Sequence, residues 1–561
     1  MLQPQDSRKT APHYRMADIP SPVLAGGALH MFVKLLETSQ LARKSIMKLN
    51  HMDLLRGQAL AETPSLLPFP PQAMFDLEMK KQSEQTEDIH PGPAVQDFLD
   101  RYQSRARTPS DVAESVLRNI QASNEGPEPL RAIIEVQAER LRTEARASSR
   151  RYEQGQPLSS LDGIPVAIKS EFFVDDHTSR AGTSFLQVPA GHPEATLVSR
   201  LRQAGALIVG VTNMHEIGIG VTGANVHQGV ARNPFDKKRH TGGSSSGSAA
   251  AVAAGLVPIA IGADGGGSVR IPSSLCGVVG LKPTFFRVSS YGSFPSTVSL
   301  CQPGPIADNV RDCALAYQII AGADPLDSMT RLQPPPSLRQ ISQVDDLSGL
   351  TAGIYSPWFE HADPDVVAVC HDVLMGLQKR GLKLVEIEIP ELEEARVAHF
   401  CTIAAEMFSY MKPYLSSHRA ELTPTTRFAL SLGSEVSASD YIQAQRVRQR
   451  TMNHLEAIFK NVDFIASPVC ATTAPPISVQ EVHGDVLDTV LMGRLMRFVQ
   501  LFNLTGNPGI SFPAGYTSQG LPVGIQFAAR WWAEADLLRV AYAGEGLVER
   551  RRPQAYWSPF E

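Results

Sequence analysis

The sequence predicts an α/β fold: one domain over residues 95–555, in which helices cover a mixed central β-sheet, preceded by helices near the N-terminus. Three observations lead to this prediction. The chain has 561 residues, 43% of them hydrophobic, which is enough to bury a large core. Short apolar segments alternate with helical patterns along the domain. The sequence shows no internal repeat that would indicate a repeat architecture.

Three segments precede the domain. Residues 1–23 are expected to form a disordered tail; the first twenty are polar and show no secretory signal, and we expect a cytoplasmic protein. Residues 24–60 have an amphipathic helical pattern, with Phe32, Leu35 and Ile46 among lysines and arginines. The basic part, 24–57, can make a peripheral membrane contact or dock its apolar face on the rest of the protein, and both interpretations stay open. Residues 61–94 are expected to form a proline-rich linker.

Inside the domain, helices are expected over residues 109–123 and 130–150, and the alternation of strands and helices follows them. Each expected strand is a short apolar run bounded by glycine, proline or polar residues. The expected strands are 164–168, 207–211, 257–262, 351–355, 382–389, 464–467, 509–512 and 523–527. The longest apolar run, 248–263, is too short to span a membrane and contains glycine and proline.

The most informative segment for function is 241–283, which holds two clusters of glycine and serine. The clusters, 242–248 and 265–268, are joined by a helix pattern of small residues and a short apolar strand. Such a segment supplies tight backbone, free N–H groups and hydroxyls. These are the groups needed to hold an oxyanion and to present a serine nucleophile.

Other interpretations of this segment fit less well. A phosphate-binding loop would need a lysine after its last glycine, and none lies between His240 and Lys282. The cluster 265–268 lacks the G-x-G-x-x-G spacing of a dinucleotide site. Residues 243–247 match the G-x-S-x-G nucleophile elbow with Ser245 as nucleophile, but 236–240 do not form the apolar strand that an elbow requires. A flexible linker would not continue into an apolar helix and strand.

A single lysine, Lys169, ends the expected strand 164–168. Burying an ammonium group is costly, so a lysine at the end of a buried strand indicates a function. The alternative is that its stem packs in the protein and its head group reaches water. Together with the two glycine and serine clusters, the functional interpretation is favoured.

These segments resemble the amidase signature family of serine hydrolases. The resemblance covers roughly residues 95–550 and rests on the strand before Lys169, the run GGSSSGSAAAVAAG and the run GADGGGSVRIPSSLCGVVGLKPT. Within the family, the sequence is most similar to plant-type fatty acid amide hydrolases. The segments that carry this closer likeness are 24–37, 150–155, 238–248, 264–273, 390–396 and 437–445.

The resemblance implies a single amidase-signature domain and a catalytic triad of Lys169, Ser244 and Ser268. In the family the bridging serine, on a cis peptide, lies 24 positions before the nucleophile, and Ser244 lies 24 positions before Ser268. Neutral Lys169 would take the proton of Ser268 through Ser244 and return it to the leaving amine, so burial must favour its neutral form. The reaction would pass through an acyl-enzyme on Ser268.

The remaining site residues follow from the same resemblance. Backbone N–H groups of Gly265, Gly266, Gly267 and Ser268 would form the oxyanion hole. Ser245 and Arg270 would support the loop, and Gly218 matches a position that lines the substrate pocket. The sequence departs from the family in one place, because many members have aspartate after the lysine whereas this chain has Ser170 and then Glu171.

The substrate implied by the resemblance is a fatty acid amide such as a long-chain N-acylethanolamine, and the family resemblance also suggests a homodimer. Two alternatives stay open: a broad-specificity amidase acting on small or aryl amides, and an amidotransferase A-type subunit. No cofactor or metal is expected, since the six cysteines have no metal-binding spacing. The net charge of −5 and the lack of a basic block argue against nucleic-acid binding.

Overall fold

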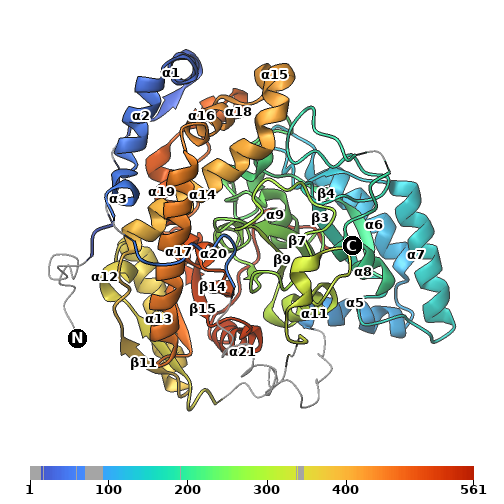
Figure 1. Ribbon diagram of the computed structural model, residues 1–561. Helices are drawn as coiled ribbons and strands as arrows, with labels where there is room; N and C mark the ends of the chain where they lie inside the picture. Colours follow the sequence, from blue (N-terminus) through green and yellow to red (C-terminus); the bar gives the residue numbers. More distant parts are fainter. Residues whose placement is uncertain are drawn as a thin grey trace.

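The computed structural model describes residues 14–16, 18–19, 21–58, 60–69, 92–189, 191–336, 338 and 346–561. Its centre is an eleven-stranded mixed sheet with helices packed around it (Figure 1). In spatial order the strands are β11 (Lys383–Glu386), β10 (Thr351–Ile354), β12 (Phe464–Pro468), β15 (Pro522–Ala529), β14 (Gly509–Tyr516), β8 (Val279–Lys282), β9 (Gln302–Ala307), β7 (Ile259–Asp264), β3 (Pro165–Lys169), β4 (Leu207–Thr212) and β2 (Ile133–Glu135). The predicted α/β class with a mixed sheet is therefore confirmed.

The direction of three neighbouring strands places the two expected functional segments together. Strand β3 pairs in parallel with β4 on one side and with β7 on the other, with Ile168 opposite Ile261 in β7. Strands β7, β9, β8, β14, β15 and β12 then pair antiparallel in turn. Because β3 and β7 run parallel and in register, Lys169 and Asp264 at their carboxyl ends lie at the same edge of the sheet.

Helices cover the sheet and form a second group around α14. The helices of the domain are α5 (Pro93–Gln103), α6 (Pro109–Ser123), α7 (Ala138–Glu153), α8 (Thr196–Gln203), α9 (Ser246–Ala253), α10 (Arg270–Leu275), α11 (Val310–Ile320), α12 (Ser356–Phe359), α13 (Pro364–Lys379), α14 (Leu392–Met411), α15 (Leu415–His418), α16 (Pro424–Gly433), α17 (Ala438–Phe459), α18 (Val479–His483), α19 (Thr489–Met496), α20 (Gln500–Leu504) and α21 (Glu534–Glu545). Capping boxes start α6 at Thr108 and α17 at Ser437, which satisfies N–H groups in the first turns of these two helices.

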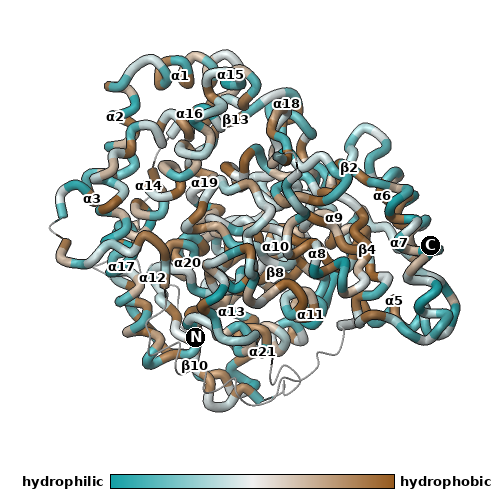
Figure 2. The backbone as a smooth tube through the Cα atoms, turned by 45° about the vertical axis from the view of Figure 1, so that its right-hand side comes forward, coloured by the Kyte–Doolittle hydropathy of each residue, from teal (hydrophilic) through white to brown (hydrophobic). Residues whose placement is uncertain are grey.

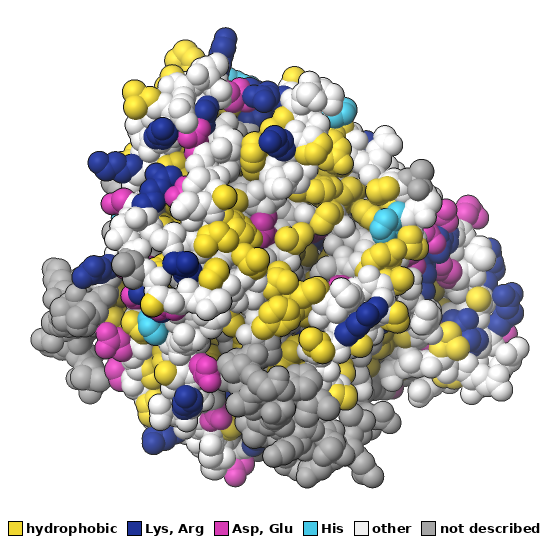
Figure 3. Space-filling view, viewed as in Figure 1, with side chains coloured by type: hydrophobic (Ala, Val, Ile, Leu, Met, Phe, Trp, Pro, Cys, Tyr) yellow, Lys and Arg dark blue, Asp and Glu magenta, His cyan; other side chains and the backbone are white. Residues whose placement is uncertain are grey.

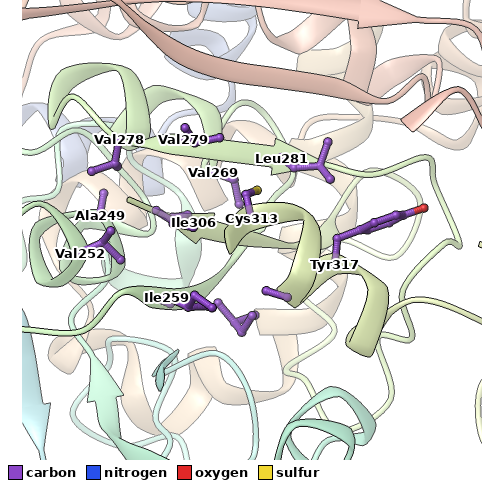
Figure 4. Close-up of a cluster of buried hydrophobic side chains, with 14 of the residues drawn as sticks. Ala249, Val252, Ile259, Val269, Val278, Val279, Leu281, Ile306, Cys313 and Tyr317 are labelled. Atoms are coloured by element: carbon purple, nitrogen blue, oxygen red, sulfur yellow. The ribbon is translucent and has the colours of Figure 1, made fainter. Parts of the chain in front are cut away.

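The main hydrophobic core is formed by the central strands and the helices packed on them, among them α9 and α11. All eight residues of α9 are buried, and its small side chains allow it to lie close to the sheet. Figure 4 shows Ala249 and Val252 of α9, Ile259 of β7, Ile306 of β9 and Tyr317 of α11 in one cluster. Hydrophobic residues concentrate on these inner elements, whereas the outer helix α7 is mostly hydrophilic (Figure 2).

The N-terminal segment forms α1 (Gly26–Thr38), α2 (Gln40–Leu49) and α3 (Asp53–Arg56), which run along one edge of the molecule (Figure 1). Helices α1 and α2 contact α16, and α3 contacts α14 and α17. One face of α1 buries Leu29, Val33 and Leu36. A short strand before it, β1 (Leu24–Ala25), pairs with β13 (Val486–Leu487). Apolar side chains also remain on the outer face, where Met31 is 74% exposed. The inner face of α1 thus docks on the protein, and a membrane contact stays a prediction.

Among the described helices, none combines the length and the apolar character that a membrane-spanning helix needs. Most of the expected tail 1–23 and of the expected linker 61–94 lies outside the described residues.

The eight expected strands all form, but three strands of the sheet were not expected. Strand β9 contains Pro303, Gly304 and Pro305, which are typical of loops, and β8 has only four residues. Strand β2 lies inside the expected helix 130–150, so that prediction was wrong at its start, and α7 begins only at Ala138.

Residues 236–240 were expected not to be the apolar strand of a nucleophile elbow, and the structure agrees with that expectation. Residues Asp236–His240 form β6, which pairs with β5 (Arg232–Asn233) in a separate two-stranded sheet. The strand is polar and its partner strand lies outside the central sheet, so it differs from the buried strand of a nucleophile elbow.

Candidate active site

One cavity brings together the residues that the sequence singles out. It lies at the carboxyl ends of β3 and β7. Lys169, Ser244 and Ser268 all line it, as do Gly218, Gly265 and Gly266. The rest of its wall combines apolar residues with the polar Glu171, Ser296 and Thr297; the apolar residues include Ile217, Ile219, Val221, Ile403, Met407 and Met496. Figure 3 shows that hydrophobic side chains also gather across the middle of the face seen in Figure 1.

Lys169 ends β3, and its side chain is 1% exposed. Its Nζ lies 2.9 Å from the hydroxyl oxygen of Ser244, 3.3 Å from the carbonyl oxygen of Ala263 and 2.8 Å from Oε2 of Glu171. The lysine head group therefore does not reach water, and the alternative of a packed stem with a solvated head does not apply. Its contact with Ser244 joins the first two members of the expected triad.

Ser244 is held just before the start of α9, on a cis peptide bond with Gly243. The segment beside it, 213–215, fixes this turn through backbone contacts. The N–H of Gly247 donates to the carbonyl oxygen of Asn213 at 2.9 Å, and the N–H of His215 donates to that of Ser244 at 3.2 Å. A Cβ atom on Gly247 would lie 2.2 Å from the carbonyl oxygen of Ala132, so only glycine fits there.

Ser268 lies in the loop between β7 and α10, which is organised around the carboxylate of Asp264. Asp264 accepts from the N–H of Gly267 at 2.7 Å and from Arg270 Nε at 2.9 Å. Asn503 Nδ2 donates to the same carboxylate at 2.9 Å. Burial opposes ionisation of Asp264, but the Arg270 guanidinium outweighs it and holds the pKa of Asp264 below its usual value. The loop is thus built around a buried ion pair.

The Asp264 contact changes the expected set of oxyanion donors. Gly267 was expected to contribute its N–H, but that N–H is directed at Asp264, and Gly267 does not line the cavity. Gly267 instead serves the turn: its φ is +108°, and a Cβ atom there would lie 2.4 Å from Val499. The N–H groups of Gly265, Gly266 and Ser268 stay the predicted donors.

His399 of α14 supports the same loop from the opposite side. Its Nε2 lies 2.9 Å from the carbonyl oxygen of Gly265. Since a carbonyl only accepts, the ring must carry its proton on Nε2. Burial lowers the pKa of His399 to about 4, so the ring is neutral near pH 7.

The other expected site residues fall in different places. Gly218 ends a 3₁₀ turn, Glu216–Gly218, and a Cβ atom on it would lie 3.5 Å from Oγ of Ser244. Arg270 is fully buried and braces the loop, donating also to Gln526 at 2.7 Å. Ser245 turns away from the cavity, and its Oγ bonds both the N–H and the carbonyl oxygen of Ala263 at 3.3 Å. This position of Ser245 does not suit a nucleophile.

Three residues of the site, Asp264, His399 and Asn503, were not expected from the sequence. Asp264 ends an apolar strand as Lys169 does, so the same argument could have identified it. His399 and Asn503 lie more than 120 residues further along the chain, inside helical patterns with no local signal. Only the fold brings them to the loop.

A second cavity adjoins the first. Both cavities are lined by Glu171, Ala263, Thr297 and Cys301. Its own wall is rich in aromatic residues, namely Phe172, Phe285, Phe286 and Phe294. The catalytic candidates are therefore next to a further, mostly apolar space.

Comparison with known proteins agrees with this geometry. The family model described as Amidase matches residues 111–538. A fatty acid amide hydrolase of Medicago truncatula is 39% identical, with 99% of this chain and 98% of the relative covered. The A-type subunit of the glutamyl-tRNA(Gln) amidotransferase of Moorella thermoacetica is 35% identical over 74% of this chain and 90% of the relative. A crystal structure of an amidase superposes with a TM-score of 0.72 at 29% identity, covering 81% of this chain and 100% of that one.

The family match spans most of the chain, and the plant relative matches nearly all of it. The protein belongs to the amidase signature family and is a hydrolase that acts on carbon–nitrogen bonds of amides.

Proposed function

We propose that the protein hydrolyses fatty acid amides, with Ser268 as the nucleophile, Ser244 as the bridge and Lys169 as the base. The observation that carries this proposal is the 2.9 Å contact between Lys169 Nζ and Ser244 Oγ in a cavity that Ser268 also lines. A serine hydroxyl is a weak nucleophile and needs a base close by. Lys169 is the titratable group in contact with the bridging serine.

The first chemical step forms the acyl-enzyme. Ser268 Oγ attacks the amide carbonyl while its proton passes to Ser244 and the proton of Ser244 passes to neutral Lys169. Negative charge then develops on the carbonyl oxygen. The N–H groups of Gly265, Gly266 and Ser268 are the donors proposed to stabilise this charge, and one such donor typically contributes about 3 kcal/mol to lowering the barrier.

The same chain of groups completes the reaction. Protonated Lys169 returns the proton through Ser244 to the leaving nitrogen, because an amide nitrogen leaves readily only as the neutral amine. Water then attacks the acyl-enzyme with Lys169 and Ser244 again taking up the proton. The acid and Ser268 are released, and the site returns to its first state.

The substrate class follows from the walls of the site. Apolar side chains form part of the first cavity and four phenylalanines line the adjoining one, and these surfaces suit the burial of a hydrocarbon chain. The Medicago truncatula relative, a fatty acid amide hydrolase, matches this chain from end to end. A long-chain N-acylethanolamine is therefore the proposed substrate.

Hydrolysis of N-acylethanolamines of graded chain length tests the proposal. We expect turnover to rise with acyl length, to be lost in Ser268→Ala and to be largely kept in Ser245→Ala, which serves as the matched control. Loss in Ser245→Ala alone would overturn the assignment of the nucleophile. Turnover of short or aryl amides only would make the protein a broad-specificity amidase, and activity only with added partner proteins would indicate a member of an amidotransferase complex.

A further inference from the structure

Glu171 is a buried acidic residue in the cavity that the mechanism above does not use. Its side chain is 7% exposed, and Oε2 lies 2.8 Å from Lys169 Nζ. The other oxygen, Oε1, lies 3.9 Å from the thiol sulfur of Cys301. The backbone carbonyl of Glu171 accepts from the N–H of Phe294 at 3.1 Å. The backbone of Glu171 is thus held by Phe294, and its carboxylate lies between Cys301 and the lysine, with one oxygen against Lys169 Nζ.

The hydrogen-bonding capacity of the three neighbours of Lys169 limits how a neutral amine can sit there. A neutral amine has two N–H bonds and one lone pair, whereas the ammonium form has three N–H bonds. The Ala263 carbonyl and an ionised Glu171 can only accept a hydrogen bond. Ser244 can also donate through its hydroxyl. All three contacts are satisfied by the neutral amine only when its lone pair faces Ser244.

We propose that Glu171 is a positioning residue for the base: by accepting one N–H of Lys169 it turns the lone pair of the amine towards Ser244. The Ala263 carbonyl accepts the second N–H and completes the orientation. This inference rests on the proposed function, in which Lys169 is the base. Glu171 would then be the third group that orients the base, as is common where a base activates a nucleophile.

The neighbouring residue Ser170 does a different task. Its Oγ accepts from the N–H of Arg180 at 3.3 Å, and its carbonyl accepts from the N–H of Ala181 at 2.9 Å. Ser170 therefore holds the loop that follows β3, while Glu171 contacts the lysine. In place of the aspartate that many family members have, Ser170 supports the loop and Glu171 orients the base.

The carboxylate also gives a pH signature. A carboxylate beside an amine favours the protonated amine, so removing the charge lets the amine lose its proton at lower pH. The other titratable groups that face Lys169 and Glu171 do not supply a replacement negative charge to the lysine near neutral pH. Burial raises the pKa of Cys301 and of Tyr410 on α14, so both stay neutral. Asp264 of β7 is ionised but paired with Arg270.

The test compares Glu171→Leu, which removes both the acceptor and the charge, and Glu171→Asp with wild type, and uses Ser170→Ala as the control from the same loop. In Glu171→Leu we expect kcat to fall about 10- to 100-fold with KM within about twofold. The acidic limb of kcat/KM should move about one pH unit lower. Labelling of Ser268 by a fluorophosphonate, which needs the activated serine but no amide turnover, should slow by the same factor.

Glu171→Asp separates the effect of the negative charge from the effect of the side-chain length. It keeps the carboxylate but is one methylene shorter, so we expect the acidic limb to stay near its wild-type position while kcat still falls about tenfold. Ser170→Ala should leave the position of the limb unchanged, although it can lower the melting temperature. Melting temperatures show that each variant is folded before its rates are compared.

Two outcomes overturn the inference. The first is a folded Glu171→Leu with an unchanged acidic limb and an unchanged labelling rate. The second is a Glu171→Asp with wild-type kcat, which decides the matter even where the leucine variant does not fold. Activity that persists in Ser268→Ala, or fluorophosphonate on another residue, would instead contradict the proposed function, and the role of Glu171 would fall with it.

Discussion

At the scale of single residues, the loop that carries Ser268 depends on Asp264. Its carboxylate accepts hydrogen bonds from Gly267, Arg270 and Asn503. One side chain therefore holds the loop, the start of α10 and α20 together. The ion pair with Arg270 is completely buried on both sides. Removing one partner of such a pair leaves an uncompensated charge in the interior.

Asp264→Asn should therefore lower the stability by about 3–5 kcal/mol and abolish most of the amidase activity. The loss follows because Arg270 keeps its charge while the loop loses its central acceptor. Urea denaturation and amide hydrolysis measure the two effects. Asp365→Asn, at an exposed position in the first turn of α13, is the control and should change neither by much. Wild-type stability of Asp264→Asn would contradict this account.

His399 predicts a pH dependence of stability. Burial lowers its pKa from 6.5 to about 4, so between these values the unfolded chain binds a proton that the folded protein does not. Stability must then fall as the pH falls through this range, by up to about 1.4 kcal/mol per pH unit from this group. Melting temperatures between pH 4 and 6.5 should show a weaker slope in His399→Gln. His371→Gln, at an exposed position of α13, should leave the slope as it is.

At the scale of elements, α9 determines how closely the Ser244 turn approaches β4 and β7. The helix consists of small residues, all buried, and Gly247 in its first turn is in contact with the backbone of residues 132 and 213. A larger side chain at Gly247 would collide with backbone atoms, which cannot move aside as a flexible side chain could. The turn that presents Ser244 would have to move with the helix.

Gly247→Ala should cost about 1–3 kcal/mol through overpacking and reduce activity more than stability alone explains. Its Cβ would lie 2.2 Å from a backbone oxygen, so the start of α9 must shift together with Ser244. Gly493→Ala is a matched control within α19, because a Cβ atom there meets nothing within 4 Å. This control should be neutral or stabilising by about 0.5–1 kcal/mol. Equal effects of the two substitutions, measured by thermal unfolding and hydrolysis, would contradict the argument.

Much of the fold could be predicted from the sequence because the buried strands are apolar and bounded by turn residues. Strand β9 could not, since its Pro-Gly-Pro sequence indicates a loop and only pairing with β7 and β8 makes it a strand. Lys169, Ser244 and Ser268 carried local signals. The contact of Glu171 with Lys169 had none, because the sequence does not say which of Ser170 and Glu171 turns towards the lysine.

At the scale of the whole molecule, α1, α2 and α3 join the N-terminal segment to helices from late in the chain. Glu37 pairs with Arg427 of α16 at 2.6 Å, and Arg56 contacts both oxygens of Asp440 of α17 at 2.8 and 2.9 Å. Leu36, next to Glu37, is fully buried. These contacts attach the segment to the group of helices around α14, which also carries His399 and Met407 of the site.

Leu36→Ala should loosen this attachment, because truncating a buried leucine typically costs about 2–5 kcal/mol. Leu35→Ala is the adjacent control, and Leu35 is 51% exposed. We expect faster hydrogen exchange and proteolysis over residues 26–49 in Leu36→Ala only, with hydrolysis of a short amide nearly unchanged. Equal protection of the segment in both variants would show that the face around Leu36 does not hold it.

The docking of α1 on α16 has a consequence for how the protein is made. Glu37 and Arg427 are separated by 390 positions. At a synthesis rate of about 5–20 residues per second, α1 leaves the ribosome roughly 20–80 s before its partner exists. During that interval the face with Leu29, Val33 and Leu36 has nothing of its own chain to cover it. The newly made chain therefore presents an apolar helix to the cell well before the enzyme can fold around it.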